Sequence, residues 1–225
     1  MTDGAAPLPP RVRVWDVPVR VSHWLMVLLV GASWWTAESK RMDWHQDAGY
    51  ALLALMSFRL YWGFFGSSTA RFSQFVRGPR TVVSYVQGRW AALPGHNPLG
   101  ALSVLALLGL LFAQIALGLF AVDVDGIESG PLSLYVSFDT GRAAAHWHDV
   151  LFDALLWLIG LHVAAVLFYL FYKKENLIAA MLHGKRAFPG GQPASVTTAS
   201  WLRFVVGVLL AGLLTWMVSR AFQFG

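Results

Sequence analysis

Five apolar stretches divide the chain, and each is too long for a β-strand. They cover residues 19–37, 46–65, 99–122, 148–172 and 201–218. A helix needs about 20 apolar residues to cross the hydrocarbon core of a bilayer. A continuous helix also satisfies its own backbone hydrogen bonds in lipid. The pattern therefore predicts an all-α integral membrane protein with five transmembrane helices.

The polar segments between these stretches alternate in charge. Basic residues without acidic neighbours follow the second stretch, and further basic residues follow the fourth; they are Arg71, Arg77, Arg80 and Arg89, and then Lys173, Lys174, Lys185 and Arg186. The segment before the fourth stretch is acidic, with Asp123, Asp125, Glu128 and Asp139 against Arg142. Because basic segments stay in the cytoplasm, we expect a cytoplasmic N-terminus. Residues 81–86 of the arginine-rich segment predict a short interfacial helix.

Composition narrows the kinds of cofactor that the chain can hold. Only 13% of its residues are charged, against about 25% in soluble domains. The net charge of +5 does not indicate nucleic-acid binding, because the basic residues lie between apolar stretches. The chain has no cysteine, which excludes disulfides, thiolate metal sites, iron–sulfur clusters and covalently attached haem. Any haem is therefore held non-covalently.

Four of the seven histidines match one another in depth across the predicted helices. His23 lies near the inner end of its helix and His45 near the outer end of the next. His148 begins the fourth stretch at the outer side, and His162 follows fourteen residues later, about 21 Å deeper on nearly the same helical face. Two stacked pairs, His45 with His148 and His23 with His162, are what two haems with two axial imidazoles each require. Such haems suit electron transfer, since no iron position stays open.

Two other readings of these histidines are open. Each histidine is also able to form a hydrogen bond between helices, and a haem-free zinc or copper transporter also uses intramembrane histidines. A transporter would usually add cysteine, methionine or carboxylate ligands at the same depth. Asp153 is the only interior carboxylate of the fourth stretch, and it lies between the two levels.

Other residues support the haem interpretation. Arg59 follows His45 by fourteen residues, on the same face at the inner level, where it is placed to bind a haem propionate or to reach the interface. Arg20 is likewise placed to bind a haem propionate or to act as a positively charged anchor at the inner side. Small residues on these helices would make room for porphyrin or for close helix contacts; they are Gly31, Gly49, Gly160, Ala164 and Ala165. His146 is a second candidate for the outer ligand, and His96 and His183 are expected in solvent at the inner side.

Several motifs together resemble a known family. They are "VWDVPVRVSHWLMVLLV", "WHQDAGYALLALMSFRLYWGFFGS", "ARFSQFVRGPR", "GHNPLGAL" and "HWHDVLFDALLWLIGLHVAAVLFYLFYKKENLIAAMLHGKR". The chain resembles the bacterial cytochrome b561 family over about residues 12–186. That family includes stand-alone dihaem cytochromes and the b-type cytochrome subunits of nickel–iron hydrogenases. The Trp-His pair at 147–148 with Leu-His fourteen residues on is the most specific part of the likeness.

The resemblance implies a four-helix transmembrane dihaem bundle, to which this chain adds a fifth C-terminal transmembrane helix. It implies two haem b groups with His23, His45, His148 and His162 as iron ligands. We therefore expect a disordered cytoplasmic N-terminus over 1–17, a cytochrome b domain over 18–182, a linker over 183–200 and a last helix within 201–225.

The function implied is electron transfer between quinone and a redox partner in the bacterial inner membrane. Ubiquinone is a candidate for the quinone, and a soluble cytochrome c or a dehydrogenase subunit for the partner. The alternatives within the family are a superoxide oxidase that reduces quinone and the membrane anchor of a hydrogenase or dehydrogenase. The acidic outer segment argues against steering of an anionic substrate such as superoxide.

Overall fold

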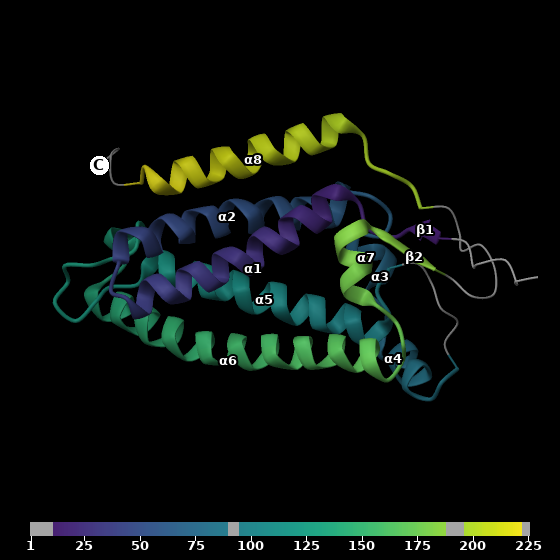
Figure 1. Ribbon diagram of the computed structural model, residues 1–225. Coiled ribbons are helices and arrows are strands. Elements are labelled where there is room, and N and C mark those ends of the chain that lie inside the picture. The colour runs from purple at the N-terminus through teal and green to yellow at the C-terminus, as the bar shows by residue number, and fades with distance from the viewer. Residues whose placement is uncertain (1–10, 90–94, 188–195, 222–225) are drawn as a thin grey trace, which may run out of the picture.

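The protein is mostly helical, and its long helices run side by side (Figure 1). The computed structural model describes residues 11–89, 95–187 and 196–221. The elements in chain order are β1 (Arg11–Arg13), α1 (Val17–Glu38), α2 (Met42–Phe65), α3 (Phe72–Phe75), α4 (Pro79–Val86), α5 (Pro98–Phe120), the 3-10 helix η1 (Ser133–Tyr135), α6 (Phe138–Phe171), α7 (Leu177–His183), β2 (Lys185–Ala187) and α8 (Trp201–Ser219). The five long helices correspond to the five apolar stretches.

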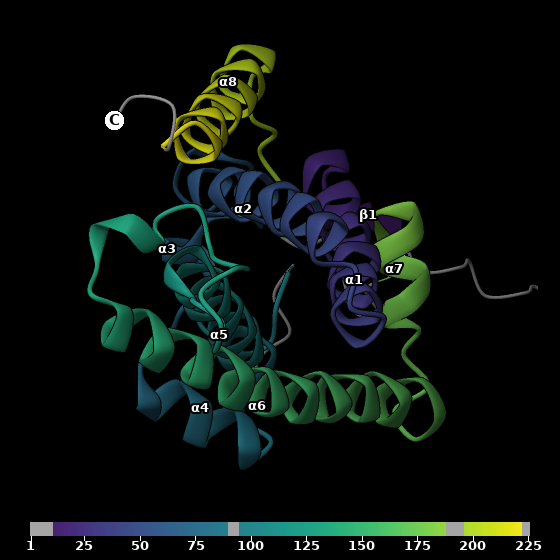
Figure 2. The same ribbon diagram turned by 90° about the vertical axis from the view of Figure 1, so that its left-hand side faces the viewer.

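Four helices among the described residues are long and apolar enough to cross a membrane, namely α1, α5, α6 and α8. The chain is therefore a multi-pass membrane protein. Helix α2 has 24 residues but carries Asp43, Asp47 and Arg59, so its composition alone does not mark it as a span. It contacts α1, α5 and α8, and Figure 2 shows it between α8 and the rest of the bundle. A helix that faces other helices accommodates polar residues that a lipid-facing helix does not. That α2 also spans the membrane stays a prediction.

The helix starts follow from capping residues in the sequence. The carboxylate of Asp16 accepts a hydrogen bond from the backbone N–H of Val19 at 2.8 Å, and Pro18 lies in the first turn of α1. The Asn97 side chain caps α5 in the same way, through the N–H of Gly100 at 2.7 Å. Both are preferred N-cap residues. Such caps satisfy N–H groups that no helical carbonyl reaches.

The start of α6 differs from the sequence expectation. The apolar run begins at His148, but Ser137 caps the helix and α6 begins at Phe138. Asp139 and Arg142 therefore lie on this helix and not in a loop. An acidic side chain in the first turn stabilises the positive end of the helix dipole, which explains why the helix extends beyond its apolar part.

The basic segments gather at one end of the bundle (Figure 1). There β1 and β2 form an antiparallel two-stranded sheet, with Arg11 opposite Ala187 and Arg13 opposite Lys185. Helix α7 contacts β2, and α3 and α4 lie at the same end of the bundle (Figure 1). The strands fall within the stretches expected to be a disordered terminus and a linker, and long-range backbone pairing orders them. The helix predicted over 81–86 is present as α4. The acidic segment and η1 lie at the opposite end.

Gly184 joins α7 to β2 and has to be glycine for two reasons. Its φ of 76° is in the left-handed region, which glycine adopts without the steric cost of a side chain. A Cβ atom there would lie 2.6 Å from the carbonyl oxygen of Trp15. The Gly184 carbonyl in turn accepts a hydrogen bond from the N–H of Val14 at 2.7 Å. This turn therefore holds the N-terminal segment against the end of the bundle.

Helix α8 packs against α2, whereas the sequence suggested an appendage separated by a linker. A Cβ atom at Gly207 would lie 2.6 Å from Cδ1 of Tyr61, and Ala211 is buried in the same cluster as Phe58. Arg203 donates a hydrogen bond to the carbonyl of Phe65 at 3.3 Å, near the C-terminal end of α2. Small residues that permit close approach are typical of helix contacts in membranes.

Candidate functional site

His45 of α2 and His148 of α6 lie side by side at the end of the bundle that holds the acidic segment. Their ring centres are 6.1 Å apart, and the ring planes are nearly perpendicular at 83°. A bond from a metal to an imidazole nitrogen is about 2 Å long, so two imidazoles on opposite sides of one metal have ring centres about 6 Å apart. The two side chains thus have the spacing of a bis-histidine pair.

Backbone carbonyls fix both rings of this outer pair. Nδ1 of His45 lies 2.9 Å from the carbonyl oxygen of Ser33, and Nδ1 of His148 lies 2.9 Å from that of Gln114. A carbonyl only accepts, so each Nδ1 carries the proton and donates it. The Nε2 atom of each ring is then left with a lone pair. Histidines that bind metals commonly have this arrangement, because the carbonyl sets both tautomer and ring orientation.

Two glycines leave space around the outer pair. A Cβ atom at Gly118 of α5 would lie 2.9 Å from Cε1 of His148, so this ring takes the room of a missing side chain. Gly49 lies one turn after His45 on α2, is half-buried, and has no atom within 4 Å of the place of a Cβ. The sequence singled out Gly49 but not Gly118.

The inner pair is looser than the outer one. Nδ1 of His162 lies 3.5 Å from the hydroxyl oxygen of Ser103 on α5, which is the limit of a hydrogen bond. Nδ1 of His23 is buried and has no hydrogen-bond partner among the described residues. The two histidines are near enough to interact electrostatically, and Arg59 also acts on His23. The structure therefore brings His23, His162 and Arg59 to one level of the bundle.

The two arginines singled out in the sequence differ in their surroundings. Arg59 is only 5% exposed, its Nη1 atom has no hydrogen-bond partner in the described residues, and its guanidinium lies 5.7 Å from the Phe72 ring centre. Arg20 donates hydrogen bonds to the carbonyls of Leu182 and Asp16 instead. A buried unpaired charge is costly, so Arg59 is the one that requires an anionic partner.

The other three histidines occupy different environments. His146 is exposed and contacts Trp147, so it is His148 and not His146 that faces His45. His183 is exposed at the end of α7, as expected. His96 was expected in solvent, and this is wrong. Its ring lies between Trp15 and Phe75, with ring centres 4.5 Å and 4.6 Å away. Burial lowers the pKa of His96 to about 3, so this imidazole is neutral at physiological pH.

Sequence reasoning missed the residues of α5 that orient the histidines of α6. Helix α5 has no histidine, yet Gln114 positions His148 through its backbone and Ser103 reaches His162. A backbone carbonyl carries no residue-specific signal, which is why no pattern pointed to Gln114. The polar Ser103 and Gln114 in an otherwise apolar stretch were the only available sign. Among the described residues, no group of three or more His, Asp or Glu side chains is arranged to hold a metal ion.

Two similar proteins carry the same description. The chain is 26% identical over 220 residues to a probable Ni/Fe-hydrogenase B-type cytochrome subunit of Azotobacter chroococcum mcd 1, covering 81% of this chain and 91% of the relative. It is 24% identical over 217 residues to a protein of the same description from Bradyrhizobium diazoefficiens, covering 80% and 87% of the two chains. No solved structure matches.

A family description, prokaryotic cytochrome b561, matches residues 14–184. This range contains α1 to α7 and all four paired histidines, and it ends before α8. With the apolar helices and the paired imidazoles, it assigns the chain a membrane electron-transfer role that uses haem b. The chain belongs to the prokaryotic cytochrome b561 family.

Proposed function

We propose that this protein is a dihaem cytochrome b that carries electrons across the inner membrane between quinone and a redox partner. The observation that carries the proposal is the outer pair, His45 and His148, with ring centres 6.1 Å apart and both Nδ1 atoms held by backbone carbonyls. Two neighbouring histidines that each keep a free Nε2 lone pair are what a metal with two imidazole ligands needs.

The outer haem would have His45 and His148 as its axial ligands. Ser33 and Gln114 keep the Nε2 atoms directed at the iron, and their hydrogen bonds raise the basicity of the ligands. Gly118 gives the His148 ring its place, and Gly49 leaves open space beside His45. The residues present therefore fit a flat macrocycle between α2 and α6.

The inner haem would have His23 and His162 as its ligands. Arg59 supplies a buried positive charge at that level, with an Nη1 atom that has no partner among the described residues. A haem propionate is the anion that would accept a charge-assisted hydrogen bond from this Nη1 atom. Arg20 is tied to the carbonyls of Leu182 and Asp16, so it supports the N-terminal segment rather than the haem.

Each haem supplies a one-electron centre when bound. The chain supplies the ligands, orients His45 and His148 through carbonyls of α1 and α5, and keeps water away with apolar residues around Met56 and Leu155. With two imidazole ligands from the chain, such a haem would be suited to electron transfer and not to binding oxygen. The two levels on α6 are separated by about 21 Å of helix, so the two haems would lie near opposite membrane faces.

The direction of insertion follows from the charge at the two ends. The basic residues of α4, α7 and their flanking segments mark the cytoplasmic end. The N-terminus is then cytoplasmic, and the acidic segment with Asp123, Asp125 and Glu128 faces outside. This orientation requires α2 to cross the membrane as well, which makes five spans in all. The acidic surface disfavours steering of superoxide and favours a basic soluble protein as the outer partner.

Attachment to a hydrogenase is the second candidate function. The two relatives are described as probable Ni/Fe-hydrogenase cytochrome subunits, which supports an anchoring role beside a dehydrogenase of that kind. In both cases quinone, such as ubiquinone, is the proposed partner in the membrane. Quinol should reduce the oxidised protein in both cases, whereas an oxidised basic cytochrome c should reoxidise the reduced protein only if a soluble cytochrome is the outer partner.

The test of the ligand pairs is haem content. We expect two haems per chain in the wild type and one in His162→Ala, with the outer haem keeping its absorption spectrum and its midpoint potential. His23→Ala should lose the same haem, whereas His45→Ala and His148→Ala should lose the other. His183→Gln, an exposed histidine on the inner side, is the control and should keep both. If His45→Ala and His162→Ala lost the same haem, the pairing would be wrong.

A further inference from the structure

Three basic side chains near the inner end of the bundle each have a buried nitrogen with no hydrogen-bond partner among the described residues. These atoms are Nδ1 of His23, Nη1 of Arg59 and Nδ1 of His96. The Arg59 guanidinium lies over the Phe72 ring, and Phe75 contacts the rings of both Phe72 and His96. The three basic residues come from α1, α2 and the segment before α5, so long-range packing alone brings them to this end. Buried polar atoms are nearly always hydrogen-bonded in native proteins. Three such atoms in one region indicate a missing acceptor.

His96 is held in a fixed position within this group. Trp15 and Phe75 enclose its ring on two sides, and the adjacent Asn97 is fixed as the N-cap of α5. Arg59 and His162 both act on His96 electrostatically. His96 therefore lies near the inner haem level and is not a solvent-exposed loop residue.

The acidic side chain nearest to this group is already engaged. The charge of Asp16 reaches Arg59, but one oxygen of Asp16 accepts from the N–H of Val19 at 2.8 Å and the other from Nε1 of Trp62 at 2.9 Å. Asp16 is thus used to cap α1 and to fix Trp62. A bound carboxylate would supply the acceptor that Arg59 and His96 lack among the described residues.

We propose that His96 and Arg59 together bind one carboxylate group of the inner haem, with Nδ1–H of His96 and Nη1–H of Arg59 as the two donors. This inference rests on the proposed function, because it requires a haem at the inner level. His96 is then a positioning residue that acts on the haem edge and not an iron ligand. The packing of its flat ring against Trp15 and Phe75 holds this donor in place.

The test compares His96→Phe and His96→Gln with the wild type. Phenylalanine keeps a flat ring but has no donor, and glutamine restores a donor. In His96→Phe we expect a lower midpoint potential for the inner haem alone, identified as the haem that His23→Ala lacks. A carboxylate without its donor keeps more negative charge near the iron and favours the oxidised state. The propionate bending band in the resonance Raman spectrum should shift as well, and His96→Gln should reverse both changes.

Each other outcome decides the question. Unchanged potential and Raman band in His96→Phe would mean that His96 only packs against Trp15 and Phe75, which overturns the proposal. Loss of a haem in both variants would identify His96 as an iron ligand and overturn it too. Loss of the inner haem in His96→Phe, with both haems retained in His96→Gln, would support the proposal. His183→Gln serves as the control. Haem content of the wild type tests the proposed function separately, whatever His96 does.

Discussion

At the scale of single residues, the second nitrogen of each histidine determines what the first can bind. His45 lies on α2 and donates from Nδ1 to the carbonyl of Ser33 on α1. His148 lies on α6 and donates from Nδ1 to the carbonyl of Gln114 on α5. The rings are thus oriented before any cofactor arrives. A preorganised ligand loses less rotamer freedom on binding, so if these histidines bind haem as proposed, the carbonyls would contribute to haem affinity without contacting the haem.

Gly118→Ala tests this orientation. A Cβ atom there would lie 2.9 Å from Cε1 of His148, so the ring has to move away from the Gln114 carbonyl. Perturbing a residue around a metal ligand typically weakens binding about 10- to 100-fold, and we expect a loss of that size in affinity for the outer haem. The measurement is haem titration of the apoprotein, followed by absorbance.

Gly109→Ala is the matched control for that variant. Gly109 lies on the same helix, is exposed, and has no atom within 4 Å of the place of a Cβ. Its affinity for both haems should equal that of the wild type. Equal affinities in both glycine variants would contradict the role given to Gly118.

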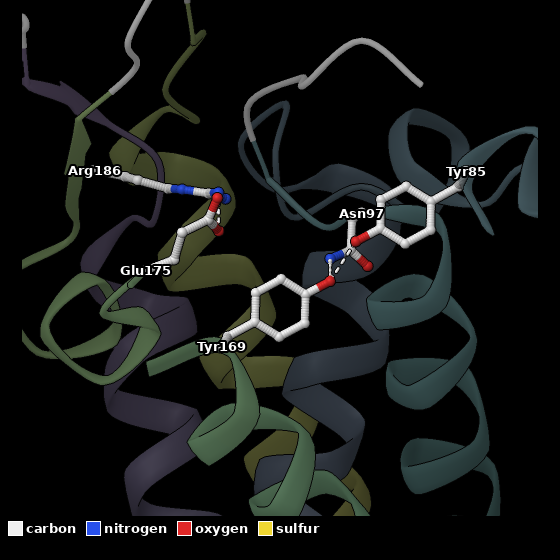
Figure 3. A network of polar contacts seen from close by, with 5 residues as sticks. All are labelled: Tyr85, Asn97, Tyr169, Glu175 and Arg186. Atoms are coloured by element: carbon white, nitrogen blue, oxygen red, sulfur yellow. Dashed lines mark hydrogen bonds and ion pairs between the residues drawn. The ribbon is translucent and has the colours of Figure 1, made fainter. Parts of the chain in front are cut away.

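At the scale of elements, one polar network fastens the amphipathic helix α4 to the bundle. The hydroxyl of Tyr85 on α4 bonds that of Tyr169 on α6, which also accepts from Nδ2 of Asn97 at 2.8 Å (Figure 3). Burial and the Tyr169 hydrogen bond raise the pKa of Tyr85, so its hydroxyl stays neutral. The nearby pair Arg186–Glu175, at 2.6 Å, joins β2 to the segment after α6.

Tyr169→Phe should release α4. The substitution removes two hydrogen bonds, each worth about 1 kcal/mol, so local opening should become roughly 30-fold more frequent. Trypsin cleavage after Arg80 or Arg89 measures this opening, and the rate should rise by the same factor. Tyr172→Phe is the control, because Tyr172 is 73% exposed and stacks on Phe168 outside the network. A cleavage rate unchanged in Tyr169→Phe would show that apolar packing alone holds α4.

At the scale of the whole molecule, the two histidine levels give the bundle a direction. The acidic segment and the basic segments lie at opposite ends of the bundle (Figure 1). The outer pair belongs to the acidic end, where Gln46, next to His45, donates to the carbonyl of Ser129. Helix α8 covers a side of α2 (Figure 2). It also lies beyond the region that the family description matches, so it is an addition to the family core.

Liposomes test the transmembrane path. Protein reconstituted with a reductant inside should pass electrons to an oxidant outside that cannot cross lipid, observed as haem reoxidation. We expect most of this reoxidation rate to be lost in His162→Ala. The variant lacks the inner haem, and about 21 Å of helix separates the two levels. Transfer to a basic cytochrome should also slow as salt screens the acidic segment. A wild-type rate in His162→Ala would mean that the protein works at one face only.

The sequence by itself determined the helices, their order in depth and the charge at the two ends. A helix rises 1.5 Å and turns 100° per residue, so spacing along the chain gives both depth and face. For this reason His45 and His148 were expected at one level, and their rings do lie side by side. That they bind iron stays a prediction.

Only the tertiary structure decided which residues surround those histidines. Gln114 and Ser103 on α5, Ser33 on α1, and the enclosure of His96 all depend on contacts between segments far apart in the chain. Hydrophobic periodicity describes one helix at a time and contains no information on its neighbours. The packing of α8 on α2 and the pairing of β1 with β2 were hidden for the same reason: the free energy that fixes them comes from the partner and not from the local sequence.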